Sequence, residues 1–446
     1  MLDRSLYQLE QLRKLATSSI DFDRIVRVEK EEYHGLVFDL SVPRYANFIA
    51  GNGAIICHNT SIVQAISGIW ASAHSEELKR GITIKVGYAD AAFYKCHETP
   101  PPEAYSTSTV CPVCGKATSF LRAVSFVDCP GHESLMTNML AGAALMDGVI
   151  LVITANEPVP MPQTREHMLA LQMLGMNKMV VVQNKIDRVD AEGAKKNYEA
   201  IKQFLSNTVG ADAPVIPVSA QNRINIDALI EAIEENIPTP KHNLKASPQM
   251  YILRSFDVNR PGADVKSLVG GVLGGSLVSG EIRVGDEIEI SPGLADERTG
   301  KYTPIATKVA SLGTGAGMTE KVGPGGLIAL GTSLDPRLTK GDVLVGNLVG
   351  KPGSLPPVRS HITLELQLFD QAVGSAALIK VDKVRATETL RLNVGTASTL
   401  GTVTSARETA AELDVKKPVV VEENARVAIS RKIAERWRLI GSGLIR

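Results

Sequence analysis

The sequence predicts an α/β domain with a parallel sheet, followed by two β-barrel domains and preceded by a shorter all-β segment. Strands alternate with helices over residues 60–240, whereas short strands between Gly-centred turns fill residues 246–350 and strand-like segments fill residues 358–446. The chain has 446 residues, enough for about three domains, and 44% of them are hydrophobic, enough for several cores.

Charge and cysteine usage narrow the class of protein. Lysine plus arginine and aspartate plus glutamate both number 48, so the net charge is zero and composition does not indicate a polyanion-binding surface. The five cysteines are odd in number and irregularly spaced, unlike a secreted disulfide framework. The first residues do not form a signal-peptide pattern, and no apolar run reaches the roughly 18 residues that cross a bilayer. We therefore expect a cytoplasmic protein with no membrane partner.

Buried strands and amphipathic helices alternate in the first large domain. Apolar runs predict strands at Leu121–Val127, Gly148–Ile153, Met179–Val182 and Val215–Val218. Helical spacing predicts helices at Thr164–Leu174, Ala191–Leu205 and Ile226–Ile237. Helices of this length between strands imply crossover connections, and hence a parallel sheet.

Glycine punctuates the part of the chain that follows. Turns are expected at Gly262, Gly280, Gly285, Gly293, Gly325 and Gly341. Many short strands between such turns indicate a β-barrel or sandwich. Lys351–Pro357 is rich in proline and glycine, which is typical of a linker, and strands are expected beyond it at His361–Leu368 and Lys417–Glu422.

The acidic residue after the strand at Leu121–Val127 begins a candidate phosphate site. Asp128 stands at the carboxyl end of that strand, where a carboxylate holds magnesium, usually through water. Gly131 lets the backbone approach a γ-phosphate, and His132 is placed to orient an attacking water. The D-x-x-G pattern alone is weak evidence for a phosphate site, and the alternative interpretation is an ordinary loop.

Two further motifs at successive strand ends indicate selection of guanine. Asp187 offers a carboxylate that accepts both N–H groups on the edge of guanine, a donor pair that adenine lacks. Asn184 is placed to join neighbouring loops, and the aliphatic part of the Lys185 side chain to cover the guanine ring. The third motif, after the next strand, consists of Ser219, Ala220 and Gln221. The three motifs in this order predict a site for GTP or GDP with magnesium.

The segment Arg80–Ile84 resembles the first switch of translational GTPases, and the segment that contains His132 resembles their second switch. The resemblance implies an α/β P-loop-type GTPase domain at residues 60–240. It also implies that Thr60, Gly81 and Thr83 line the magnesium site and that His132 helps to position water for hydrolysis of GTP. The Gly-rich segment around Gly285 resembles the second domain of these proteins.

An insertion at residues 96–114 resembles the zinc knuckle of the gamma subunit of archaeal and eukaryotic initiation factor two. That knuckle is built on two Cys-x-x-Cys pairs, and this chain retains Cys96, Cys111 and Cys114. Thr99 stands where the family has its other cysteine, and a threonine hydroxyl is a poor zinc ligand. His97 or water would have to complete a zinc site; the alternative is a vestigial knuckle with three reduced thiols.

The resemblance to the gamma subunit implies partners as well as an activity. Such a subunit binds initiator methionyl-tRNA when loaded with GTP, assembles with alpha and beta subunits, and delivers the tRNA to the small ribosomal subunit. Arg254, Arg260 and Arg283 are candidate tRNA contacts. The alternatives are an elongation-type GTPase that carries another aminoacyl-tRNA, or an inactive precursor or truncated gene product.

Residues 1–59 do not follow the pattern of a GTPase. The phosphate-binding pattern G-x-x-x-x-G-K-[ST] does not occur in the chain, and the family pattern resumes at Thr60, so the first strand and the P-loop are missing. Leu36–Val42, Asn47–Gly53 and Cys57–Asn59 instead resemble the C-terminal splicing region of an intein. We therefore expect residues 1–59 to form an all-β intein fragment that interrupts the phosphate-binding loop.

Splicing chemistry agrees with the residues at this junction. The side-chain nitrogen of Asn59 can attack its own carbonyl carbon and cut the bond to Thr60, while His58 polarises that carbonyl. Thr60 has the hydroxyl that accepts an acyl group, and Asp39 stands where the family has an assisting acid. The chain begins at Met1 without an N-terminal nucleophile, which leaves three explanations: splicing in trans, a gene start placed too late, or a decayed gene.

Overall fold

The computed structural model describes most of the chain after the first 59 residues. The described residues are 60–69, 87–129, 145–259, 262, 268–296, 298–370, 380–433 and 435–446. The chain divides into two compact units, Met1–Ile56 and Cys57–Arg446. The first unit lies outside the described residues, and the expected all-β intein fragment at residues 1–59 lies there with it.

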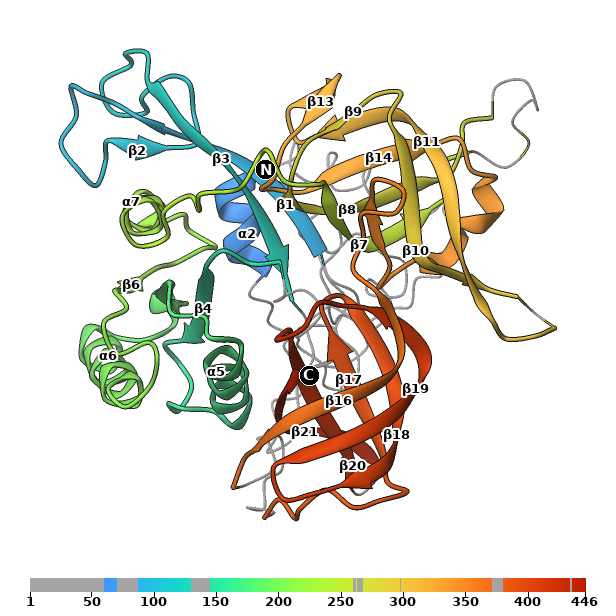
Figure 1. Ribbon diagram of the computed structural model, residues 1–446. Helices are drawn as coiled ribbons and strands as arrows, with labels where there is room; N and C mark the ends of the chain where they lie inside the picture. Colours follow the sequence, from blue (N-terminus) through green and yellow to red (C-terminus); the bar gives the residue numbers. More distant parts are fainter. Residues whose placement is uncertain are drawn as a thin grey trace, which may run out of the picture. The chain divides into compact units, whose positions relative to one another are not determined.

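An antiparallel sheet opens the α/β domain (Figure 1). Its order is β2-β1-β3, with bounds Gly87–Lys95 for β1, Tyr105–Ser106 for β2 and Ser119–Asp128 for β3. The long pairing of β1 with β3 runs from Gly87 opposite Asp128 to Lys95 opposite Ser119. β3 confirms the expected strand at Leu121–Val127, whereas its antiparallel partner β1 was not predicted from the sequence.

A parallel sheet of order β4-β5-β6 confirms the expected crossover architecture. Its strands are β4 at Val149–Thr154, β5 at Met179–Asn184 and β6 at Val215–Pro217. The expected helices are present as α5 at Pro162–Leu174, α6 at Ala191–Leu205 and α7 at Ile226–Asn236, and the short helix α2 spans Thr60–Ser67. All six residues of β5 are buried, as expected of a strand covered on both faces.

The second domain is a ring of six strands with additional short pieces. The ring follows the order β10-β15-β7-β8-β14-β11 and is closed by pairing of β10 with β11. These strands are β7 at Gln249–Phe256, β8 at Val272–Ser279, β10 at Glu287–Ala295, β11 at Tyr302–Thr314, β14 at Ile328–Thr332 and β15 at Leu348–Gly350. The additional pieces are β9 at Ile282–Arg283, β12 at Gly317–Thr319, β13 at Lys321–Val322, η4 at Pro336–Leu338 and η5 at Lys340–Asp342. One apolar core that includes Met250, Leu273 and Leu330 fills the ring.

The third domain is a closed barrel of order β16-β19-β18-β17-β20-β21. Its strands are β16 at Val358–Leu368, β17 at Thr389–Val394, β18 at Ala397–Ala406, β19 at Ala410–Val420, β20 at Arg426–Ile433 and β21 at Arg436–Ile445. The strand expected at His361–Leu368 is confirmed. The one expected at Lys417–Glu422 is wrong at its end, because β19 stops at Val420. Two closed barrels after an α/β domain confirm the predicted fold class.

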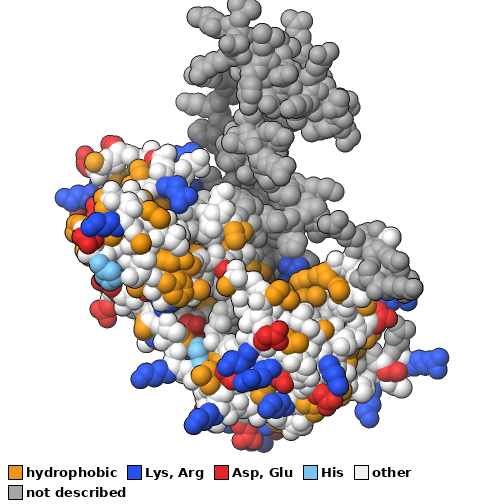
Figure 2. Space-filling view, turned by 90° about the horizontal axis from the view of Figure 1, so that it is seen from above, with side chains coloured by type: hydrophobic (Ala, Val, Ile, Leu, Met, Phe, Trp, Pro, Cys, Tyr) orange, Lys and Arg blue, Asp and Glu red, His pale blue; other side chains and the backbone are white. Residues whose placement is uncertain are grey.

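The charged side chains on the surface reflect the equal numbers of acidic and basic residues in the sequence. On the face drawn in Figure 2, lysine and arginine side chains are interspersed with aspartate and glutamate, and neither sign forms a continuous field. Within the described part of the chain, no helix combines the length and apolar character needed to cross a membrane.

Candidate nucleotide site and thiol cluster

The buried amide of Asn184 joins two of the predicted base-reading loops. Asn184 is the last residue of β5, and its Oδ1 accepts the backbone N–H of Lys185 at 2.8 Å and that of Ala220 at 3.2 Å. The parallel pairing of β5 with β6 brings the two loops to the same edge of the sheet. Lys185 has a left-handed backbone (φ 62°), which turns the chain into the short helix η2 at Ile186–Arg188. The predicted role of Asn184 as a tie between loops is therefore consistent with its contacts.

Asp187 is held in one orientation by a buried serine. The Ser219 hydroxyl donates to Asp187 Oδ1 at 2.5 Å, and Ser219 is fully buried while Asp187 is exposed. Ser219 Oγ also accepts the side-chain N–H of Asn222 at 3.1 Å, so the Ser219 hydroxyl proton is left to point toward Asp187. Asp187 Oδ2 has no partner among the described residues, so it can accept from a ligand. Gln221 is exposed.

A network of polar side chains that the sequence did not reveal holds α6 against the strands that carry these loops. Gln183 Nε2 donates to the carbonyl of Ala194 at 2.8 Å and to Asn197 Oδ1 at 2.9 Å. Asn197 Nδ2 donates in turn to the carbonyls of Thr154 and Glu157. The network ties α6 to the carboxyl ends of β4 and β5. Its one sequence signal is Gln183, a polar residue inside the apolar run of β5, because a buried amide must find partners.

The predicted phosphate side of the site is described only in part. Asp128 ends β3 and is half-buried, and Thr60 is the first residue of α2. Burial and the charge of Asp128 raise the pKa of the neighbouring Cys129 to about 12. The remaining predicted residues lie outside the described part of the chain: His58, Asn59, Gly81, Thr83, Gly131 and His132.

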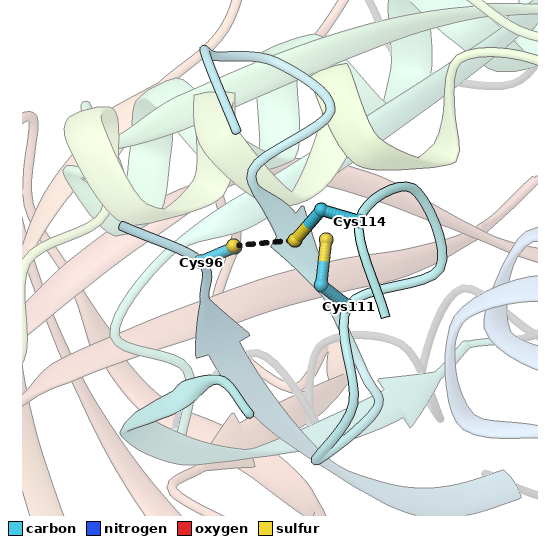
Figure 3. A group of neighbouring side chains, drawn as sticks. All are labelled: Cys96, Cys111 and Cys114. Carbon is cyan, nitrogen blue, oxygen red and sulfur yellow. Dashed lines mark hydrogen bonds between the residues drawn. The ribbon is translucent and has the colours of Figure 1, made fainter. Parts of the chain in front are cut away.

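Three cysteines of the insertion converge on one point (Figure 3). The sulfurs of Cys96, Cys111 and Cys114 all lie within 4.8 Å of one another, and the Cys96 and Cys114 sulfurs are 3.5 Å apart. Two sulfurs on one tetrahedral zinc lie about 3.8 Å apart, because a Zn–S bond is about 2.3 Å. The turn that aligns Cys111 and Cys114 closes at Gly115, whose N–H donates to the Cys111 carbonyl and whose left-handed φ of 71° suits glycine. The donor set therefore fits a thiolate-binding metal.

Thr99, rather than His97, lies against this cluster. Thr99 is buried, and its Oγ1 lies 3.3 Å from the sulfur of Cys111. His97 is exposed, and its Nε2 lies 2.9 Å from Ser119 Oγ, so the expectation that His97 might complete the set is not supported. Hydrogen bonds from the Cys114 backbone and the Thr99 side chain lower the pKa of Cys111 to about 6, and those from Thr99 and the Glu98 backbone also lower the pKa of Cys96. These bonds favour the thiolate forms that bind metals.

Comparison with family models defines the class of protein. Residues 53–239 match the model described as "Elongation factor Tu GTP binding domain", and residues 360–445 match the model described as "Initiation factor eIF2 gamma, C terminal". Together with the fold and the base-reading loops, these matches define a translational GTPase, whose GTPase domain binds GTP or GDP and magnesium and hydrolyses GTP.

Curated relatives identify the family. The chain is 55% identical over 387 residues to translation initiation factor 2 subunit gamma of Archaeoglobus fulgidus. The matched region covers 87% of this chain and 91% of that relative. The same subunit of Pyrococcus furiosus is 54% identical over 389 residues, covering 87% and 94% of the two chains. The chain belongs to the family of translation initiation factor 2 gamma subunits. This membership favours the initiation factor over the elongation-type alternative.

Solved structures of lower identity share the fold. A bacterial selenocysteine-specific elongation factor is 22% identical with a TM-score of 0.64, over 86% of this chain and 55% of that chain. The elongation factor SelB of Methanococcus maripaludis is 20% identical with a TM-score of 0.63, over 87% of this chain and 76% of that chain. The present chain thus spans about half the length of the first of these two proteins, and the likeness concerns the fold alone.

Proposed function

We propose that the chain, once its missing phosphate-binding loop is joined to Thr60, binds GTP and carries initiator methionyl-tRNA to the small ribosomal subunit together with alpha and beta subunits. The observation that carries this proposal is the base-reading pair of loops, in which Asn184 bridges both loops and Ser219 orients Asp187. Membership in the gamma-subunit family supports the choice of tRNA and of partner subunits.

The remaining site residues take roles around the phosphates. Asp128 and Gly131 approach magnesium and the γ-phosphate, Thr60, Gly81 and Thr83 line the magnesium site, and His132 orients water. If Thr60 is the last residue of G-x-x-x-x-G-K-[ST], then His58 and Asn59 fall where the pattern has its second glycine and its lysine. The cationic group that reaches the β- and γ-phosphates is therefore missing from this chain.

The consequence is measurable by calorimetric titration with GTP and magnesium. We expect the 446-residue chain to bind GTP at least about a hundredfold more weakly than the ligated protein, because a charge-assisted contact with phosphate contributes roughly 1.5–3 kcal/mol and the loop's backbone donors are lost as well. Equal affinities would contradict the role assigned to the missing loop.

Initiator specificity is tested with two aminoacylated tRNAs. We expect the ligated, GTP-loaded protein to prefer initiator over elongator methionyl-tRNA, and loss of that preference would favour an elongation-type carrier. Among the candidate contacts, Arg254 donates to Asp342 Oδ1 at 2.9 Å within the second domain, whereas the side chain of Arg283 is 65% exposed and Arg260 lies outside the described residues. Arg283 is therefore the first candidate to substitute.

We further propose that residues 1–59 are the C-terminal fragment of an intein. The segment from Thr60 to Arg446 has 387 residues, the length over which the Archaeoglobus fulgidus relative matches. In the proposed step, the side-chain nitrogen of Asn59 attacks its own carbonyl carbon, a succinimide forms, and the bond to the Thr60 nitrogen breaks as that nitrogen takes up a proton. His58 polarises the carbonyl, and the Thr60 hydroxyl is the acyl acceptor during ligation.

Intact-mass measurement of the expressed chain tests this proposal. We expect a product that begins at Thr60, or an extended N-terminus if a partner fragment is present. Asn59→Ala should abolish release, whereas Asn52→Ala, an asparagine of the same segment, should leave it unchanged. An intact chain with no product, or the same product from Asn59→Ala, would contradict the proposal and favour a decayed gene.

For the insertion we propose a zinc site held by Cys96, Cys111 and Cys114. Three sulfurs within 4.8 Å support it; a water would complete the tetrahedron, and the Thr99 hydroxyl would donate to the Cys111 thiolate. The bound ion would cross-link the start of the insertion to its turn.

A single substitution tests the zinc site. Thr99→Cys should raise zinc affinity at least tenfold, because a sulfur would replace an oxygen that already lies 3.3 Å from Cys111 Sγ. Thr118→Cys is the matched control, since the Thr118 hydroxyl donates to the Ser108 carbonyl instead. Competition with a chromophoric chelator measures the zinc affinities. Equal affinities for Thr99→Cys and the parent chain would contradict the proposal.

A further inference from the structure

The loop that carries the proposed base-reading residues is held at both of its ends by one buried amide. Gln183 is the residue of β5 directly before Asn184, and it is 1% exposed. Its Nε2 donates to the Ala194 carbonyl at 2.8 Å and to Asn197 Oδ1 at 2.9 Å, and both acceptors belong to α6. The ten residues at 184–193 therefore leave the sheet and enter the helix at two points that are hydrogen-bonded to each other.

Alternation along β5 separates the side chain that supports the loop from the side chain that joins the two base-reading loops. Successive side chains of a strand point to opposite faces, so Gln183 and Asn184 leave β5 on opposite sides. Asn184 accepts the Ala220 N–H, whereas Gln183 donates to α6. Burial of an amide costs free energy unless its N–H groups find acceptors. The two bonds of Gln183 Nε2 satisfy both of its N–H groups and hold α6 against the end of β5.

A second amide extends this support to the neighbouring loop. Asn197 is half-buried, and its Nδ2 donates to the carbonyls of Thr154 at 3.3 Å and Glu157 at 3.0 Å. Thr154 is the last residue of β4 and lies opposite Asn184 in the parallel register. Asn197 thus accepts from Gln183 and donates to the loop after β4. We call Gln183 and Asn197 the amide pair.

The loop between these two points has an irregular backbone that must be held in place. Lys185 has a left-handed φ of 62°, a conformation that costs free energy in a residue other than glycine. Asp190 ends the loop by accepting the Gly193 N–H at 2.8 Å as the cap of α6. Asp187 lies between Lys185 and Asp190, so the position of its carboxylate depends on both ends of the loop. A displacement of about 1 Å is enough to weaken a directional contact strongly.

We propose that Gln183 and Asn197 are positioning residues for guanine, which hold the loop at 184–193 so that Asp187 meets both N–H groups on the edge of the base. The amide pair acts through the loop and is assigned no contact with the nucleotide. The inference rests on the proposed function for the base that Asp187 reads. It adds two residues that set how strictly that base is selected.

Inosine triphosphate is the probe that separates positioning from general stability. It lacks the 2-amino group of guanine, so Asp187 would accept one N–H from it instead of two. In the ligated protein with magnesium, we expect GTP to bind about 10- to 100-fold more tightly than inosine triphosphate, because a hydrogen bond to a charged acceptor contributes about that factor. Loss of folded protein lowers both affinities alike and leaves their ratio unchanged, whereas a displaced Asp187 lowers the ratio.

Two variants of the amide pair and one core variant make the comparison. Gln183→Met removes both donors and keeps the length of the buried side chain, so the ratio of GTP to inosine triphosphate affinity should fall at least about fivefold in calorimetric titration. Asn197→Ala, at a half-buried position, should also lower the ratio. Ile201→Ala is the control, since Ile201 is fully buried in α6 and belongs to the same core cluster as Val181 of β5. It should destabilise the domain and leave the ratio unchanged.

The outcomes distinguish this inference from the proposed function. A ratio that stays at the parent value in Gln183→Met and Asn197→Ala would overturn the positioning role and leave base reading by Asp187 intact. An equal fall of the ratio in Ile201→Ala would overturn it as well. If Gln183→Met does not fold, Asn197→Ala decides the test. Equal affinities of the parent protein for the two nucleotides would overturn base reading itself, and the positioning role with it.

Discussion

At the scale of single residues, the proposed selectivity for guanine depends on two buried side chains, Asn184 and Ser219. Asn184 is 1% exposed and receives backbone donors from both loops, so a movement of one loop would break a buried hydrogen bond with the other. Ser219 fixes Asp187 through one carboxylate oxygen and leaves the other toward solvent. The two loops proposed to read the base are thus ordered without a ligand, and such order lowers the entropic cost of binding.

Substitution of the base-reading carboxylate should be specific. In the ligated protein, Asp187→Asn replaces a charged acceptor by an amide, and we expect GTP affinity to fall about 10- to 100-fold, since hydrogen bonds to charged groups contribute roughly 1.5–3 kcal/mol. Asp190→Asn is the matched control, because Asp190 caps α6 by accepting the Gly193 N–H at 2.8 Å. Fluorescence titration with a labelled guanine nucleotide measures both; similar losses in the two variants would contradict base reading by Asp187.

Thiol reactivity offers a second test at this scale. Burial and the charge of Asp128 raise the pKa of Cys129 to about 12, so this thiol stays neutral at pH 8. In metal-free chain, iodoacetamide should therefore modify the exposed Cys114 at least about a hundredfold faster than Cys129. Peptide mapping measures the rates, which should become equal in urea. Equal rates in the folded chain would refute the burial argument.

At the scale of elements, the sequence predicted what hydrophobic periodicity determines. The strands and helices from Val149 to Asn236 were expected within a few residues because apolar runs and helical spacing mark them directly. β1 was missed because its alanines and a central Asp90 give it little apolar pattern, and its stability comes from pairing with β3. The thiol cluster was predicted from spacing, but the positions of His97 and Thr99 depend on side-chain direction, which spacing does not encode.

Helix α7 should be a main support of the nucleotide-binding sheet. Leu229 is fully buried in the cluster that also contains Val180 and Val182 of β5, so Leu229→Ala should destabilise the domain by about 2–5 kcal/mol. Leu169→Ala in α5, where the leucine is 37% exposed, should cost less than about 1 kcal/mol. The free energy of opening from hydrogen exchange within β5 measures both. Equal costs would contradict the assigned core.

At the scale of the whole molecule, two closed barrels follow an α/β domain. Both barrels close their sheets and have continuous cores, whereas the described strands of the α/β domain form two separate sheets. The fold class followed from the sequence because closed barrels and crossovers leave clear patterns. The absence of G-x-x-x-x-G-K-[ST] was also visible in the sequence.

Competition between nucleotides tests most directly the claim that loops after separate strands converge on one guanine base. The protein to use is the ligated product, with its lysine-bearing loop restored, titrated with GTP and with ATP in the presence of magnesium. Because Asp187 accepts a donor pair that adenine lacks, we predict a preference for GTP of at least about a hundredfold. Equal affinity for the two nucleotides would contradict the account.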